Sequence, residues 1–181
     1  DLFGFFPGSF VGNPDLRPET SRGWEAGLRW SSSRWEIGAA VFSNRLRNEI
    51  VDTFDPATFR SSTANPDGVS PRDGFELALG YRHSAWLALR ANYTLLDSDQ
   101  QVAAGAALVR EVRRPRHSAN LLAFGSSGRL SWGASLSYVG VRRDTDFDRF
   151  PAPIVRLDDY ALGMLRFGWR GRPELQLYGR V

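Results

Sequence analysis

Apolar and polar residues alternate along most of the chain with a period of two. In the first such run the odd positions carry glycine and charged side chains, and the even positions are Trp24, Ala26, Leu28 and Trp30. Successive side chains of a strand point to opposite faces, so the pattern predicts a strand with one apolar and one polar face. The same alternation recurs at residues 35–44, 75–82, 87–95, 118–123, 130–138, 165–169 and 175–180, with Leu122 as an interruption. The sequence therefore predicts about eight strands and no competing helix.

The connections between these runs alternate in length. Short ones fall at residues 31–34, 83–84, 126–128 and 170–173, and long ones at about 49–71, 97–113 and 142–156. Short periplasmic turns and long external loops are typical of barrels in the bacterial outer membrane. Aromatic side chains beside the short turns fit a girdle at the lipid–water boundary; they are Trp30, Trp35, Tyr81, Trp132 and Trp169.

The fold class that follows is all-β, a transmembrane antiparallel β-barrel. No stretch of 18 apolar residues offers a spanning helix, but a spanning strand needs only about 9–11 residues with one apolar face. We expect the 181 residues to form part of a larger up-and-down barrel in contact with outer-membrane lipid. The chain starts without methionine and stops inside an alternating run, so we expect both ends to be cut.

Charge and composition argue against several classes of protein. All 23 basic residues are arginine, and they are interspersed with 20 acidic residues to give a net charge of +3, which indicates a solvated mixed surface and no nucleic-acid partner. The absence of cysteine removes thiolate catalysis, cysteine-ligated zinc and disulfides. His83 and His117 lie far apart, and no catalytic or phosphate-binding motif is present. We therefore expect no enzyme activity and no cofactor.

One proline-rich segment precedes the first strand. Its residues Asn13, Pro14, Leu16, Arg17, Pro18 and Glu19 lie within a Gly-Asn-Pro-Asp-Leu-Arg-Pro-Glu-Thr-Ser stretch that leads into Trp-Glu-Ala-Gly. The prolines remove ladder donors and should hold the chain off the sheet until Thr20, and the opposite charges of Arg17 and Glu19 can pair at the barrel rim. The stretch resembles the motif that precedes a strand in TonB-dependent receptors.

Later stretches carry the same resemblance. Arg-Pro-Arg-His-Ser at residues 114–118 and Tyr-Val-Gly-Val-Arg-Arg-Asp at residues 138–144 resemble the start and the end of late strands in that family. The resemblance implies that residues 1–181 are the C-terminal part of the barrel domain, with the plug domain, the TonB box and the final strand absent. The late strands and the loop at 142–156 look most like the cobalamin transporter branch.

The resemblance implies transport without covalent chemistry. A barrel of about 22 strands would surround a plug, bind a nutrient such as cobalamin or siderophore-bound iron outside, and import it with energy from the TonB complex through an absent N-terminal region. A passive porin or structural barrel without a plug is the alternative. A barrel enzyme would need a catalytic constellation that is not visible, and a soluble sugar-binding sandwich would fold without detergent.

Two groups of residues are candidates for contacts. Ligand contacts are expected on the long loop that carries Arg142, Arg143, Asp144, Asp146, Phe147, Asp148 and Arg149, where charge-assisted hydrogen bonds can hold polar ligand edges. The aspartate spacing also hints at calcium, but an EF-hand needs Gly and Glu where Arg149 and Val155 stand, so a solvated loop is favoured and no metal is expected. Residues expected to face the lumen or the plug are Glu25, Arg29, Glu36, Glu76, Arg90, Asn92, Arg116, Asn120 and Arg166.

Overall fold

The computed structural model describes residues 8–172 and 174–181, and within them all regular structure is β-strand. Among these residues, no helix is long and apolar enough to cross a membrane. The prediction of an all-β antiparallel fold is confirmed.

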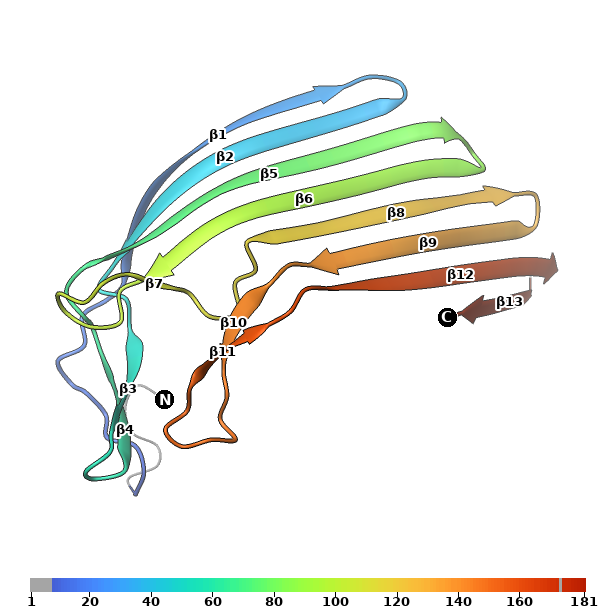
Figure 1. The fold of residues 1–181 in the computed structure, drawn as a ribbon. Helices are drawn as coiled ribbons and strands as arrows, with labels where there is room; N and C mark the ends of the chain where they lie inside the picture. The colour runs from blue at the N-terminus through green and yellow to red at the C-terminus, as the bar shows by residue number, and fades with distance from the viewer. Residues whose placement is uncertain (1–7, 173) are drawn as a thin grey trace. The chain divides into compact units, whose positions relative to one another are not determined.

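Eight strands form an antiparallel meander in which sequence neighbours pair, as Figure 1 shows. Their order is β1 (Thr20–Ser31), β2 (Trp35–Arg47), β5 (Val69–Ser84), β6 (Leu87–Gln100), β8 (His117–Ser127), β9 (Leu130–Val139), β12 (Tyr160–Arg172) and β13 (Leu175–Arg180). Each corresponds to one run of alternating residues. The first strand begins at Thr20, directly after the proline-rich segment, as the missing ladder donors of that segment predict.

The long connections contain strands that the sequence pattern did not predict. The connection after β2 holds a hairpin of β3 (Val51–Asp55) and β4 (Arg60–Ala64), and the connection after β6 holds β7 (Val109–Arg110), which pairs with the end of β6. The connection after β9 holds a hairpin of β10 (Arg142–Thr145) and β11 (Ile154–Leu157). The sequence pattern predicted these segments only as long connections. Short strands pair within two of them, and β7 in the third pairs with the end of β6.

The chain divides into two compact units, which are described separately. Among the described residues, the loop unit comprises 8–24, 43–72 and 98–111, and the wall unit comprises 25–42, 73–97, 112–172 and 174–181. Almost all fully buried side chains among the described residues lie in the loop unit, and most of them are polar.

The wall unit is a single layer with continuous apolar and polar rows. Across β6, β8 and β9, Tyr93 pairs with Ala119, which pairs with Tyr138. The next row along the strands joins Asn92 and Asn120. Apolar side chains stay uncovered, and Leu28 is 71% exposed. Such a layer has no internal core, so its apolar face requires an apolar surrounding such as lipid hydrocarbon.

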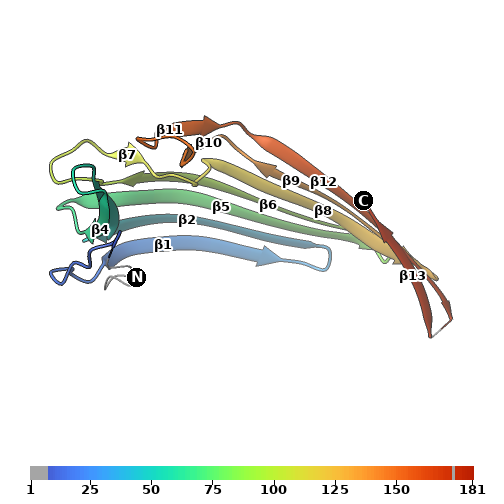
Figure 2. The same ribbon diagram turned by 90° about the horizontal axis from the view of Figure 1, so that it is seen from below.

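The short turns are closed by local hydrogen bonds. The hydroxyl of Ser32 accepts from the backbone N–H of Trp35 at 3.2 Å, and Gly128 adopts a φ of 57°, a left-handed conformation that favours glycine. Figure 2 shows these turns at one end of the strands of the wall unit, opposite the connection that carries the hairpin β10–β11.

Candidate functional site

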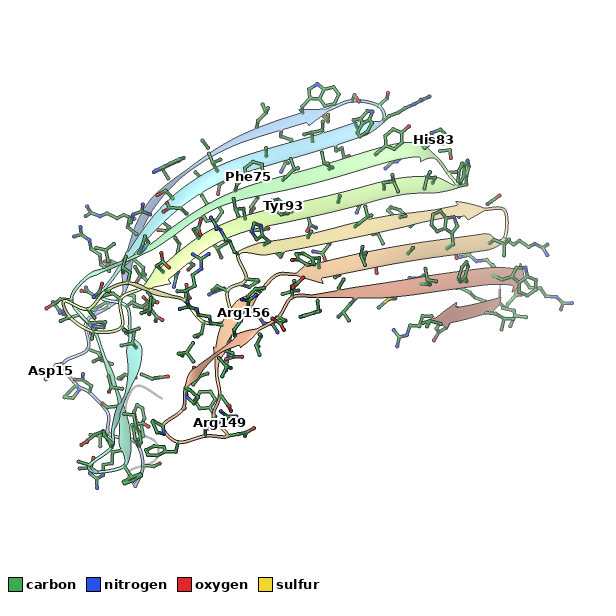
Figure 3. The ribbon with its side chains drawn as sticks, viewed as in Figure 1. Asp15, Phe75, His83, Tyr93, Arg149 and Arg156 are labelled. Carbon is green, nitrogen blue, oxygen red and sulfur yellow. The ribbon has the colours of Figure 1, made fainter. Side chains whose placement is uncertain are left out.

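The proline-rich segment is held in the loop unit by side-chain hydrogen bonds. Asn13 accepts from the backbone N–H of Asp15 at 3.0 Å, a local turn of the kind expected for asparagine, and its Nδ2 donates to the Thr63 carbonyl at 2.8 Å. Figure 3 labels Asp15 in this turn. The segment is therefore docked against strand β4 through backbone groups.

Asn65 is the main anchor of this segment. Its Oδ1 accepts from the Arg17 N–H at 2.7 Å, and its Nδ2 donates to the carbonyls of Arg17 at 3.1 Å and Asn48 at 2.6 Å. One amide thus satisfies three backbone groups from two segments far apart in sequence.

The charged residues of the motif have separate partners. Arg17 forms an exposed ion pair with Asp67 at 3.1 Å, and Glu19 accepts from the Ile50 N–H at 2.7 Å. The expectation that Arg17 and Glu19 pair with each other was wrong, because each side chain reaches across to the connection after β2.

A buried ionic network lies at the base of the two long connections in the loop unit. Arg72 donates from Nη2 to Glu49 Oε1 at 3.1 Å. Its Nε and Nη2 also bind both oxygens of Glu111, at 3.0 and 3.1 Å, in a bidentate pair. The carboxylate side chains are only 9% and 12% exposed. One guanidinium therefore joins the connection between β2 and β5 to the connection between β6 and β8.

Two buried hydroxyls complete this network, and we name the set Glu49, Ser70, Arg72, Ser98 and Glu111 the base network. Ser70 donates to Glu49 and Ser98 donates to Glu111, and both serines are 1% exposed. The two hydroxyl donors add to the stabilisation that the Arg72 guanidinium gives the buried carboxylates.

Gln101 extends the network into the loop that follows β6. Its backbone N–H donates to Ser70 Oγ at 3.0 Å, and its Nε2 donates to the carbonyls of Ala103 at 2.6 Å and Ala106 at 2.9 Å. The Gln101 side chain therefore holds the loop at residues 101–106 through two carbonyl groups, and the Gln101 backbone N–H ties the start of the loop to the base network.

The base network was not found from the sequence. Arg72 lies 23 and 39 residues from its two partners, so no local spacing reveals the contacts. The sequence signal that remains is one charged residue near the end of each long connection. Any solvated loop would also show such a residue.

The candidate ligand residues lie on the hairpin β10–β11 of the wall unit. Arg113 donates to Asp144 Oδ1 at 2.8 Å, and this hydrogen bond lowers the pKa of the Asp144 carboxyl below its ordinary value. Asp146 pairs with Arg149 at 3.4 Å and accepts from the Asp148 N–H at 3.1 Å. Two aspartates of the calcium-like spacing therefore face guanidinium groups.

The tip of this hairpin presents uncovered aromatic and charged side chains. Phe147 is 74% exposed, and the Arg149 side chain is 75% exposed. At the base of the hairpin, Arg142 lies over the ring of Tyr160 with its Cζ 5.3 Å from the centroid. The remaining candidate, Arg143, is anchored through its carbonyl, which accepts from the Arg113 N–H at 2.7 Å. Within the described residues, no group of three or more His, Asp or Glu is arranged to hold a metal ion.

Several of the residues expected to face the lumen contact a neighbour within the wall unit, and others line concavities of the sheet. Asn120 donates to Asn92 at 3.0 Å along one polar row, and Arg116 pairs with Asp97 at 3.1 Å. Arg90 lies 5.7 Å from the centroid of the Phe124 ring. One concavity of the sheet brings together Glu25, Arg29, Glu76 and Asn92; Glu36 lines a second one and Arg166 a third.

The third concavity has an apolar floor that the alternation did not predict. It has a volume of about 620 Å³ and is lined by Leu122, Phe124 and Met164 together with Arg82 and Arg166. Leu122 pairs with Arg90 in register, so the residue that interrupts the sequence pattern lies on the polar face.

Comparisons with known proteins agree on one family. Residues 1–181 match the family model described as TonB dependent receptor-like, beta-barrel. The iron-regulated outer membrane virulence protein of Vibrio cholerae serotype O1 is 31% identical over 147 residues, which cover 74% of this chain and 22% of that protein.

Solved structures share the fold at lower identity. The siderophore receptor PiuA from Acinetobacter baumannii has a TM-score of 0.70 at 21% identity, over 93% of this chain and 25% of that one. The copper transporter OprC has a TM-score of 0.70 at 13% identity, over 92% of this chain and 25% of that one. The chain therefore spans about a quarter of the length of these relatives.

Proposed function

Because the chain belongs to the TonB-dependent receptor β-barrel family, we propose that it contributes wall strands and external loops to a receptor that imports a scarce nutrient. In this proposal import is active and depends on the TonB complex, which acts through a region outside this chain. The chain itself, residues 1–181, is proposed to be the C-terminal part of the barrel domain, with the plug domain, the TonB box and the final strand lying outside it.

The predicted location in the outer membrane is confirmed, since the homologues are outer-membrane receptors. Their names also direct the choice of cargo. The Vibrio relative is iron-regulated and PiuA is a siderophore receptor, so we propose a ferric siderophore as cargo ahead of cobalamin. Cobalamin stays a prediction from the sequence resemblance.

The base network is the structural observation that best supports a receptor. A ligand-binding loop gains affinity when it is ordered before the ligand arrives. Arg72 and its two carboxylate partners fix the starts and ends of two long connections in the loop unit. Such anchoring serves a binding surface, whereas a passive pore needs only an open lumen.

The hairpin β10–β11 is proposed to supply ligand contacts. Phe147 offers an uncovered ring, and Arg149 offers a guanidinium whose planar donors suit carboxylate or catecholate oxygens. The polar row of Asn92 and Asn120 is proposed to face the plug. The similar proteins include a receptor and a transporter, which favours ligand binding by this chain over catalysis.

The test uses the full-length receptor in detergent and in cells. We expect saturable binding of a ferric catecholate siderophore without comparable binding of cyanocobalamin, and uptake of radioactive iron that stops when TonB is deleted. Steady conductance in planar bilayers without added ligand, together with uptake that persists without TonB, would establish a passive porin instead. Tight binding of cyanocobalamin alone would replace iron by cobalamin as the cargo.

A further inference from the structure

More arginines have carboxylate partners at the long-connection end of the wall unit than at the short turns. At the end with the long connections, four arginines have carboxylate partners: Arg113 with Asp144, Arg116 with Asp97, Arg149 with Asp146 and Arg156 with Asp158. At the short turns, Arg34, Arg129, Arg170 and Arg172 are exposed. Within residues 8–172 and 174–181, none of these four forms an ion pair.

The four unpaired arginines lie at three of the short turns along one edge of the sheet, and we name them the short-turn rim. The turn before β2 lies beside the turn before β6, because the Arg82 N–H donates to the Arg34 carbonyl at 2.8 Å. The turn before β9 adjoins the end of β12, because the Arg170 N–H donates to the Arg129 carbonyl at 2.9 Å. The turn segments 31–35, 83–87, 127–130 and 169–175 contain one carboxylate, Glu174.

Indole rings accompany these guanidinium groups. Trp30, Trp35, Trp86 and Trp169 are 41–52% exposed beside the same turns. Trp35 also stacks on Tyr81 with ring centroids 4.3 Å apart. Figure 3 labels His83 in this region, near the end of β5. Tryptophan concentrates at the level of lipid headgroups, so the rim lies where the acyl region gives way to phosphate.

We propose that the short-turn rim binds the phosphates of anionic glycerophospholipids, such as phosphatidylglycerol, in the periplasmic leaflet. An exposed guanidinium without a carboxylate partner retains its donors for a phosphate, which it can bind in a bidentate geometry. The tryptophans hold the glycerol and upper acyl region in place. A phospholipid fits this rim better than free phosphate, because its acyl chains can lie against the apolar face of the wall, where Leu130 is 59% exposed.

The proposal rests on the wall crossing the membrane and is independent of the cargo. Its test measures lipid binding without siderophore or TonB, so a receptor that imports a different nutrient gives the same result. Failure of lipid selection with intact siderophore uptake would overturn this inference and leave the proposed function standing.

The experiment is native mass spectrometry of the full-length receptor with equal amounts of phosphatidylglycerol and phosphatidylethanolamine. Each basic side chain near an anionic lipid surface raises binding about fivefold. We expect a clear preference for phosphatidylglycerol that falls by at least about tenfold in the variant R34Q/R129Q/R170Q/R172Q. The variant R34K/R129K/R170K/R172K should keep most of the preference for phosphatidylglycerol. This charge-conserving control separates the loss of charge from misfolding caused by the four substitutions.

A matched control removes the same charge from the other end. The variant R113Q/R116Q/R149Q/R156Q should keep the preference for phosphatidylglycerol. Excess inorganic phosphate should not displace the lipid, since the acyl chains contribute to binding. Equal lipid ratios in wild type and rim variant, an equal loss in the control, or displacement by inorganic phosphate would each overturn the proposal.

Discussion

Replacing Arg72 by alanine should open both long connections of the loop unit. The substitution leaves the carboxylates of Glu49 and Glu111, which are 9% and 12% exposed, without their guanidinium partner. Removing one partner of a buried ion pair costs about 3–5 kcal/mol. The Arg72 side chain is 28% exposed and water can reach the site, so we expect a cost below this range, about 2–3 kcal/mol.

Hydrogen exchange of the full-length receptor measures this loss locally. The amide N–H groups of Gln101 and Glu111 donate to Ser70 Oγ and to the Ser98 carbonyl, so peptides covering residues 98–111 report on the base network. A loss of 2–3 kcal/mol raises their exchange rate about 30- to 150-fold. Affinity for the ligand should fall with it, because the loops then become ordered only on binding.

Two comparison variants make the result decisive. R17A removes an ion pair whose side chains are 59% and 81% exposed, and its effect should stay within about fivefold. The triple variant E49Q/R72M/E111Q buries no charge and should exchange more slowly than R72A. Exchange in R72A no faster than in R17A would refute the role assigned to the buried guanidinium.

Further expectations concern the hairpin β10–β11 and the proline-rich segment. The pKa of Asp144 is lowered by Arg113, so this pair stabilises the hairpin above about pH 4 and is lost as the pH falls through the lower native pKa. After correction for the intrinsic pH dependence of amide exchange, the protection of residues 142–157 should fall in acid in wild type, and an equal loss of protection in D144N would contradict this. N65A should cost about 1–3 kcal/mol, since three backbone groups lose a partner; proteolysis of residues 13–19 at the wild-type rate would show that Asn65 is no anchor. F147S should leave stability within about 0.5 kcal/mol, because the ring is 74% exposed, and should weaken siderophore binding about tenfold; unchanged affinity would remove Phe147 from the proposed contacts.

The strands of the wall were predictable because their determinants are local. Every second residue must be apolar where one face meets hydrocarbon, and the run from Leu87 to Leu95 shows this within a few residues. The docking of the proline-rich segment was partly predictable, since its turn residues and its end at Thr20 follow from backbone chemistry.

The base network and the hairpins could not be predicted in the same way. Arg72 finds its partners through the register of distant strands, which no spacing along the chain encodes. Strands β3 and β4 are five residues each, too short for alternation to stand out in a polar loop. Leu122 interrupts the alternation in the sequence, and in the structure it lines the apolar floor of a concavity on the polar face.

The placement of the base network has a bearing on how such a receptor diversifies. The anchoring contacts at Glu49, Arg72 and Glu111 lie outside the hairpin turn at residues 56–59 and the turn at residues 103–106. We therefore expect sequence changes within these two turns to leave the base network intact. Under the proposed function, we expect that these two turns can be exchanged for those of other family members, and ligand preference altered, without disturbing the base network.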